Sequence, residues 1–197
     1  DDVGFFRPST KEWQLRLQNG TTIITLVAFG LNGDVPVVGD WNGDGIDTIG
    51  IFRPSTNEWI LSNGPNTNNT SPPENIHIVF GQNGDIPIVG DWNGDGLDTP
   101  GLFRPSNSQF LLSNGFLSTV DITPFTFGVL GSRPVTGDWD GDGVTTIGVF
   151  SPGRGQVALN NTNTSGNGVG DIVFSFGLNG DFPLAGDWDG QAEVPVN

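Results

Sequence analysis

Short runs of β-branched and aromatic residues recur along the whole chain, and clusters of Gly, Pro, Asn and Asp separate them. In one representative stretch the runs fall at residues 35–39, 49–53, 58–62 and 76–80. Runs of this length, bounded by turn-forming residues, predict short β-strands. No stretch shows a helical period of useful length. The pattern therefore predicts an all-β chain.

Three sequence markers repeat four times, at spacings of roughly 50 residues, which is the period of propeller blades. Gly-Asp-Trp begins at residues 39, 90, 137 and 186, Phe-Gly begins at 29, 80, 127 and 176, and Phe-Arg-Pro or its degenerate copy begins at 6, 52, 103 and 150. Four strands in each of four units predict a four-bladed β-propeller. We expect one domain, 1–197, with repeat units at about 35–85, 86–132, 133–181, and 182–197 plus 1–34.

The two ends of the chain complement each other. The opening DDVGFFRPST aligns with DTIGIFRPST, which includes a second strand, and the closing DFPLAGDWDG contains a first strand. We therefore expect the N- and C-terminal strands to pair in one blade and close the ring, which leaves no open sheet edge. The alternatives are a fragment of a seven-bladed ring, or four blades that assemble with a partner chain.

The composition narrows the classes of partner. With 22 Asp and Glu against 7 Lys and Arg, the net charge is −15, which disfavours nucleic acid and anionic membranes and favours cations. The chain has no Cys, and no apolar run approaches the roughly 20 residues that span a bilayer. We therefore expect no membrane insertion. Because the chain also has no Met, we expect a mature form or a portion of something longer.

An acidic loop follows each Gly-Asp-Trp marker. In DWNGDGIDT the first, third and fifth positions are Asp40, Asn42 and Asp44, and the sixth is Gly45. Oxygen ligands on alternate residues, with a sharp bend at Gly, are how one short segment wraps Ca²⁺. The alternative is a plain Asn-Gly or Asp-Gly hairpin turn, but a turn alone does not require Asp40. The loop is not an EF-hand, because position 12 is Ile51 and both flanks are strand-like.

GDWNGDGIDTIGIF, preceded by FGLNGDVPVV, resembles the FG-GAP (VCBS-like) repeats of integrin alpha-chain-type propellers across essentially the whole chain. The resemblance implies that each loop joins the first two strands of a blade. It also implies a Ca²⁺ site formed by side chains at positions 1, 3, 5 and 9 and the carbonyl at 7. Carried over, the metal ligands are Asp40, Asn42, Asp44, Ile46 and Thr48; Asp91, Asn93, Asp95, Leu97 and Thr99; and Asp138, Asp140, Asp142, Val144 and Thr146.

Two departures from the family pattern concern the strength of these sites. Position 9 carries Thr where the family usually has Asp, which weakens the first two sites unless Asp47 or Asp98, one position earlier, contributes. The third loop has Thr145 at that earlier position and cannot compensate in this way. The fourth loop keeps only Asp187 and Asp189, and Asp2 falls at its position 9 if the ring closes. We therefore expect three Ca²⁺ sites and a doubtful fourth.

A second pattern places an Asp before the first strand and an Arg at the end of the second, as Asp34 with Arg53, Asp85 with Arg104, and Asp181 with Arg7. The remaining unit has Ser132 and Ser151 instead. We interpret the pattern as an ion pair within each hairpin, at the end opposite the acidic loop. The loop tryptophans Trp41, Trp92, Trp139 and Trp188, and the third-strand residues Trp13, Trp59, Phe110 and Val157, are interpreted as packing residues.

Catalysis is poorly supported, because the single His77 is predicted at the surface and no Ser, His and Asp set accompanies it. We expect a non-catalytic, calcium-binding, extracellular or cell-surface module for recognition or adhesion, with a glycan (lectin-like) or protein ligand, and a monomer if the ring closes. The alternative is a structural or accessory domain of a larger secreted protein such as a hydrolase or adhesin. Extracellular placement follows because weak loops, with Kd of about 10⁻⁴ to 10⁻³ M, fill only where calcium is abundant.

Overall fold

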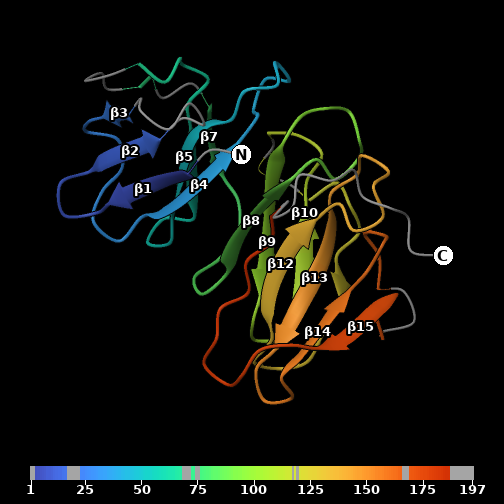
Figure 1. Cartoon of the computed structure of the whole chain (residues 1–197). Helices are drawn as coiled ribbons and strands as arrows, with labels where there is room; N and C mark the ends of the chain where they lie inside the picture. Colours follow the sequence, from blue (N-terminus) through green and yellow to red (C-terminus); the bar gives the residue numbers. More distant parts are fainter. Residues whose placement is uncertain are drawn as a thin grey trace. The chain divides into compact units, whose positions relative to one another are not determined.

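The computed structural model describes residues 3–16, 23–67, 72–73, 76–116, 118, 120–165 and 169–186. Throughout these ranges the regular structure is β-strand, and no helix occurs in them (Figure 1). The chain divides into two compact units, residues 1–83 and 84–197.

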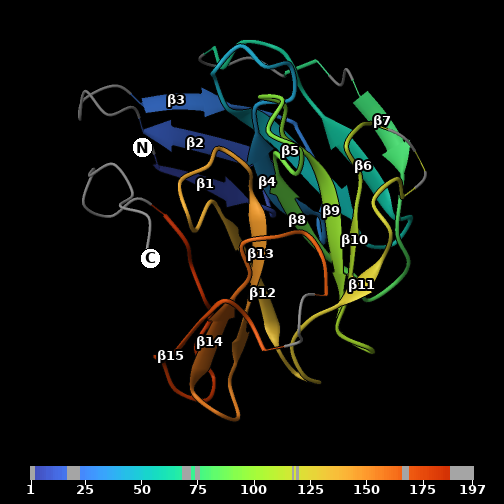
Figure 2. The same cartoon turned by 90° about the vertical axis from the view of Figure 1, so that its right-hand side faces the viewer.

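The first unit contains two antiparallel sheets. Blade A consists of β1 (Val3–Arg7), β2 (Glu12–Arg16) and β3 (Ile23–Leu26), in the order β1-β2-β3. Blade B consists of β4 (Val35–Gly39), β5 (Thr48–Arg53), β6 (Glu58–Leu61) and β7 (Ile76–Val79), in the order β4-β5-β6-β7. Figure 2 shows the three strands of blade A side by side as a meander.

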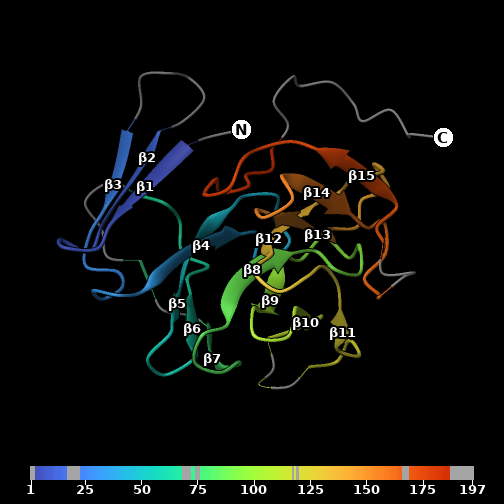
Figure 3. The same ribbon diagram turned by 90° about the horizontal axis from the view of Figure 1, so that it is seen from below.

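The second unit repeats this arrangement. Blade C consists of β8 (Ile86–Gly90), β9 (Thr99–Arg104), β10 (Gln109–Leu112) and β11 (Phe125–Thr126). Blade D consists of β12 (Arg133–Gly137), β13 (Thr146–Ser151), β14 (Gln156–Leu159) and β15 (Ile172–Ser175). Strands β8 and β12, the first strands of the two blades, lie side by side (Figure 3).

The structure confirms the all-β class and four antiparallel blades of the propeller type, one per repeat. The strands predicted between residues 35 and 80 are observed to within one residue at each end. Blade A has three strands in the described part of the chain, and residues 182–186, expected to supply its first strand, are described without strand structure. Because β1 and residues 182–186 belong to different units, the pairing of the terminal strands stays a prediction.

The second strand of each complete blade is buried on both faces, which explains why its sequence is apolar rather than alternating. Five of the six residues of β5 and of β9 are buried, and so are all six of β13. A Gly in the middle of the strand makes this possible. A Cβ added at Gly101 would lie 2.8 Å from the Trp92 ring and 2.9 Å from Leu112. The close packing of three strands therefore excludes any side chain there.

The aromatic residues predicted to pack do so. The third-strand residues Trp13, Trp59, Phe110 and Val157 are all buried, as are the loop residues Trp41 and Trp92. The Trp13 and Trp59 indoles also donate to the carbonyls of Phe29 and Phe80, the first residues of the Phe-Gly markers. Trp139 is half-buried and donates to the Ile147 carbonyl. Trp188 lies outside the described residues.

The predicted ion pairs fix the far end of two hairpins. The Arg53 guanidinium donates to both carboxylate oxygens of Asp34 at 3.0 Å, and Arg104 does the same to Asp85 at 2.9 Å. Both carboxylates are almost completely buried, with 2% and 1% of the side chain exposed. The hydrogen bonds to these carboxylates raise the pKa of both arginines. Each pair is therefore a bidentate ion pair with a buried carboxylate, and not an ion pair on the protein surface.

Blade D replaces the ion pair by a neutral contact. Ser132 and Ser151 lie opposite each other, with their hydroxyl oxygens 3.0 Å apart and buried. The two serines thus substitute together for Asp and Arg because a small hydrogen-bonded pair also satisfies both polar groups. The pair expected between Asp181 and Arg7 stays a prediction.

Candidate metal centre

Three acidic loops occupy equivalent places in three blades. Loop 1 (residues 40–48) joins β4 to β5, loop 2 (91–99) joins β8 to β9, and loop 3 (138–146) joins β12 to β13. The strand register pairs the residue before each loop with its ninth residue, as Gly39 with Thr48, for example. The loop ends are therefore held together by the sheet, as the resemblance implied.

The Asp at position 1 organises the loop backbone. Asp40 Oδ1 accepts from the N–H groups of Asn42, Gly43 and Asp44 at 3.3, 2.7 and 3.2 Å, and Oδ2 accepts from Gly45 at 2.6 Å. Desolvation works to raise the pKa of Asp40, but these four backbone donors together lower it. Asp91 and Asp138 make the same kind of bonds.

The expectation that a turn alone does not require Asp40 is wrong. A turn of this type does use its first Asp, because that carboxylate satisfies backbone donors that the tight bend leaves unpaired. The bend itself requires Gly at positions 4 and 6, since Gly43 and Gly45 have φ of 73° and 81°. Position 1 therefore does not distinguish a metal loop from a turn, and the distinction rests on positions 3 and 5.

In loops 1 and 2 the side chains at positions 3 and 5 satisfy each other. The Asn42 amide donates to Asp44 Oδ2 at 3.0 Å, and Asn93 donates to Asp95 Oδ2 at 3.0 Å. Each loop nevertheless brings two carboxylates and an amide oxygen to one short segment, and these are the hard oxygen ligands that Ca²⁺ prefers.

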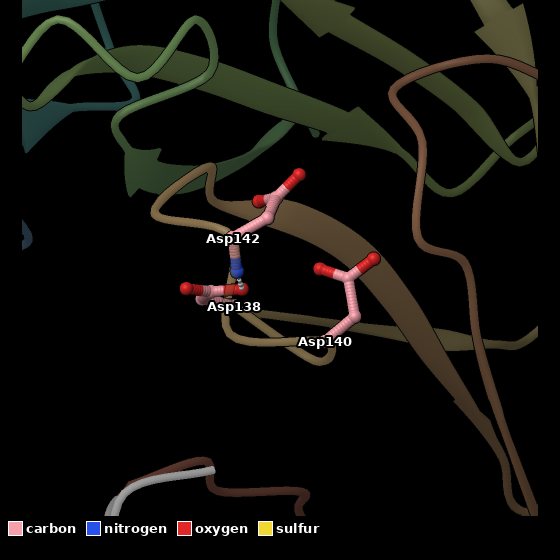
Figure 4. A group of neighbouring side chains, drawn as sticks. All are labelled: Asp138, Asp140 and Asp142. Carbon is pink, nitrogen blue, oxygen red and sulfur yellow. Dashed lines mark hydrogen bonds between the residues drawn. The ribbon is translucent and has the colours of Figure 1, made fainter. Parts of the chain in front are cut away.

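Loop 3 has no such neutral donor, because position 3 is also an aspartate. One carboxylate oxygen from each of Asp138, Asp140 and Asp142 lies within 4.8 Å of the others (Figure 4). Asp140 Oδ1 is buried and has no hydrogen-bond donor. A buried carboxylate oxygen without a donor is costly unless a cation compensates it. The donor set of loop 3 therefore fits a hard divalent cation.

The residues at positions 7 and 9 of the three loops make hydrogen bonds within their own hairpins, with one exception. The N–H groups of Ile46, Leu97 and Val144 donate to the position-5 carboxylates at 2.8–2.9 Å. The Thr99 and Thr146 hydroxyls donate to the carbonyls of Gly90 and Gly137 at 3.4 and 3.2 Å, whereas Thr48 Oγ1 is buried without a partner. Ligation by the position-7 carbonyls and the position-9 hydroxyls stays a prediction.

Asp47, at position 8 of loop 1, lies close enough to Asp40 to interact with its charge. Burial raises the pKa of Asp47, and the negative charge of Asp40 raises it further. A cation in loop 1 would reverse this effect by attracting both carboxylates. The three residues predicted for the fourth loop, Asp2, Asp187 and Asp189, lie outside the described residues.

Polar residues of neighbouring segments support the loops, and the sequence did not predict them. The Asn66 amide donates to the Asp47 carbonyl at 3.1 Å, and the Asn163 amide donates to the Trp92 and Thr145 carbonyls at 3.3 and 2.9 Å. Both asparagines lie in connections between the third and fourth strands of a blade, and the sequences of these connections differ from blade to blade. Nothing in the composition of these connections singles out one Asn.

The single histidine lies at the surface, as predicted. His77 is exposed on β7, and its Nδ1 lies 3.4 Å from Glu58 on the neighbouring strand.

Within the described ranges, no helix is long and apolar enough to cross a membrane.

Comparisons with protein-family models, with curated proteins and with solved structures found no match for this chain.

Proposed function

We propose that the chain is a non-catalytic, calcium-binding β-propeller module whose loops 1, 2 and 3 each hold one Ca²⁺. The observation that carries the proposal is the loop 3 cluster, in which three carboxylates converge and Asp140 Oδ1 is buried without a donor. Asp138, Asp140 and Asp142 would hold the ion there, which would supply positive charge to carboxylates that otherwise repel one another.

Loops 1 and 2 are proposed as sites of the same type with one charge fewer. Their backbone bonds match those of loop 3, and the Asn side chain at position 3 can turn its oxygen toward an ion. Because the number of charged ligands helps to set the affinity of calcium loops, we expect loop 3 to bind most tightly.

Thermal unfolding tests the metal assignment. The chain is measured after EDTA treatment, with and without millimolar Ca²⁺, and we expect Ca²⁺ to raise the Tm because an ion that binds only the folded state stabilises it. Asp140→Asn should reduce this increase. Asp121→Asn, which removes a charge outside the loops of the same unit but keeps the acceptor for the Asn114 N–H, is the matched control. A Tm that does not respond to Ca²⁺ contradicts the proposal.

We further propose extracellular recognition or adhesion as the role of the module, with a glycan or protein as ligand. Two grooves support this role. One, of about 1360 Å³, lies within the first unit beside Asp44 and Ile46, and the other, of about 610 Å³, lies within the second unit beside Phe125 and Asn163. Each groove is adjacent to a loop or a loop-supporting residue, so metal binding would stiffen its wall.

A glycan array probed with the labelled chain tests the recognition role. We expect binding in Ca²⁺ that is lost in EDTA. Glycan binding that persists in EDTA contradicts the calcium-dependent part of the proposal. Absence of glycan and cell-surface binding in Ca²⁺, with a normal Tm increase, contradicts the recognition role and favours a structural or accessory domain.

A further inference from the structure

We infer that Thr145 of loop 3, supported by Asn163, is a positioning residue for the metal site of loop 2, so that one blade completes the site of its neighbour. This inference rests on the proposed calcium binding. It concerns blades C and D, which belong to the same unit.

Thr145 and Asp91 form a reciprocal pair of hydrogen bonds across the two blades. The Thr145 N–H donates to the Asp91 carbonyl at 2.7 Å, and the Asp91 N–H donates to the Thr145 hydroxyl at 3.1 Å. Asp91 is position 1 of loop 2, and its carboxylate organises the whole loop. Loop 3 therefore fixes the backbone of the residue on which loop 2 depends.

Close packing accompanies these bonds. The Thr145 methyl lies 2.4 Å from where a Cβ would stand on Gly90, so only Gly allows this approach. Val144 lies 3.2 Å from the Cβ position of Gly94, inside loop 2. The two loops are in van der Waals contact as well as hydrogen-bonded, which limits how far loop 2 can move alone.

Asn163, in the connection between β14 and β15, binds both loop 2 and loop 3. Its amide donates to the Trp92 carbonyl in loop 2 and to the Thr145 carbonyl in loop 3. One side chain thus joins the second residue of loop 2 to the eighth residue of loop 3, and four hydrogen bonds in all connect the two loops in addition to the apolar contacts.

Position 8 is Thr145 in loop 3 but Asp47 and Asp98 in loops 1 and 2. The Thr145 hydroxyl accepts the Asp91 N–H and the Thr145 N–H donates to the Asp91 carbonyl, which fixes the backbone of loop 2 at its first position. Because a preorganised loop loses less conformational freedom when an ion binds, Thr145 should strengthen the Ca²⁺ affinity of loop 2.

An amide NMR titration of the whole chain with Ca²⁺ tests the inference, because Gly45, Gly96 and Gly143 report loops 1, 2 and 3 separately. Thr145→Val removes the hydroxyl and keeps the shape. We expect Thr145→Val to lower the Ca²⁺ affinity of loop 2 about fivefold, which is at the lower end of the usual coupling between sites. The Ca²⁺ affinity of loop 1 should stay the same. Thr145→Ser restores the hydroxyl and should restore the affinity. Asn163→Ala gives a second variant in case Thr145→Val folds poorly, and it should also weaken loop 2.

The outcomes separate the inference from the proposed function. If the unaltered chain shows no Ca²⁺-dependent shifts, the proposed function fails and the inference fails with it. If the unaltered chain binds Ca²⁺ but Thr145→Val leaves the Ca²⁺ affinity of loop 2 unchanged, the inference alone is overturned. The same holds if Thr145→Val lowers the Ca²⁺ affinities of loops 1 and 2 equally. Faster hydrogen exchange of the Asp91 amide in Thr145→Val, with the Asp40 amide unchanged, would support the positioning role without any metal.

Discussion

Blades C and D share one backbone arrangement but differ in the chemistry at one end of their first hairpin. Both hairpins begin with a five-residue strand and keep the same register, Gly90 opposite Thr99 and Gly137 opposite Thr146. At the end far from the loop, blade C holds a buried ion pair where blade D holds a buried pair of hydroxyls. The backbone and the core therefore define the hairpin, and the polar pair at its end can change provided that both members change together.

The same two hairpins differ at the loop end. Position 3 is Asn93 in loop 2 and Asp140 in loop 3, and this one change converts a mutually satisfied pair into a cluster of three carboxylates. Asp91 and Asp138 make the same hydrogen bonds to their loop backbones, so the loop conformation does not depend on the residue at position 3. Loop shape and loop charge are thus set by different positions.

The largest expected effect comes from breaking the ion pair of blade C. Arg104→Ala removes the guanidinium that donates to both oxygens of the buried Asp85 carboxylate, and we expect a loss of about 3–5 kcal/mol in the free energy of unfolding. In blade D, Ser132→Ala removes two neutral hydrogen bonds, one with the Ser151 hydroxyl and one from the Val129 N–H, and should cost about 2 kcal/mol. Urea unfolding measures both.

The double variant Asp85→Ser, Arg104→Ser sharpens this comparison, because it gives blade C the pair that blade D already has. We expect it to be more stable than Arg104→Ala, since both polar groups can again satisfy each other. Equal stabilities of Arg104→Ala and Ser132→Ala would show that the ion pair contributes no more than the hydroxyl pair.

The second prediction concerns the Gly in the middle of the second strand. Gly101→Ala brings a Cβ to 2.8 Å from Trp92, and Gly148→Ala brings one to 2.6 Å from Leu159, so each should destabilise by about 1–3 kcal/mol. Only Gly101→Ala should disturb the environment of Trp92, which near-UV circular dichroism detects. Gly115→Ala is the control, because its Cβ would meet no atom within 4 Å.

An unchanged stability in Gly101→Ala would mean that the packing of blade C is looser than its contacts indicate. An equal near-UV change in Gly101→Ala and Gly148→Ala would mean that the change comes from a disturbance shared by blades C and D. It would then not come from the contact between residue 101 and Trp92.

The third prediction exchanges the residues at position 3. Asn93→Asp gives loop 2 the third carboxylate of loop 3, and Asp140→Asn does the reverse. We expect each exchange to shift the Ca²⁺ affinity of its own loop by roughly tenfold, about 1.4 kcal/mol, upward in loop 2 and downward in loop 3. Isothermal titration calorimetry measures the shift. If both exchanges leave the affinities unchanged, position 3 is not a ligand in either loop.

Much of the fold was readable from the sequence because the repeats supply four copies of each signal. The strand runs, the buried third-strand residues and the Asp34–Arg53 pair each follow from spacing and alternation. The burial of that pair was not readable, since it depends on what packs above the hairpin. The expectation that a turn does not require Asp40 was wrong, because a sequence pattern does not show which backbone N–H groups a carboxylate meets.

The site was predictable only as far as each loop could be considered alone. Positions 1, 3 and 5 came from the alternation within one loop, and loop 3 does bring its three aspartates together. The contacts of Thr145 and Asn163 with loop 2 join residues 54 to 71 positions apart, in a variable connection and a position that breaks the repeat. Such contacts depend on how neighbouring blades pack, which no repeat pattern specifies.

The smallest expected effect concerns the threonines at position 9, which the resemblance to FG-GAP repeats assigns as ligands. Thr146→Val removes a hydroxyl that donates to the Gly137 carbonyl at 3.2 Å, and Thr99→Val removes a longer bond of 3.4 Å. Without metal, each should cost less than about 1 kcal/mol, and Thr99→Val less than Thr146→Val. If the hydroxyls also ligate Ca²⁺, each substitution should additionally lower the Ca²⁺ affinity of its own loop, measured by the same calorimetric titration. Unchanged affinities would assign position 9 to the hairpin alone, and the ion would then be held by positions 1, 3 and 5 and by backbone carbonyls.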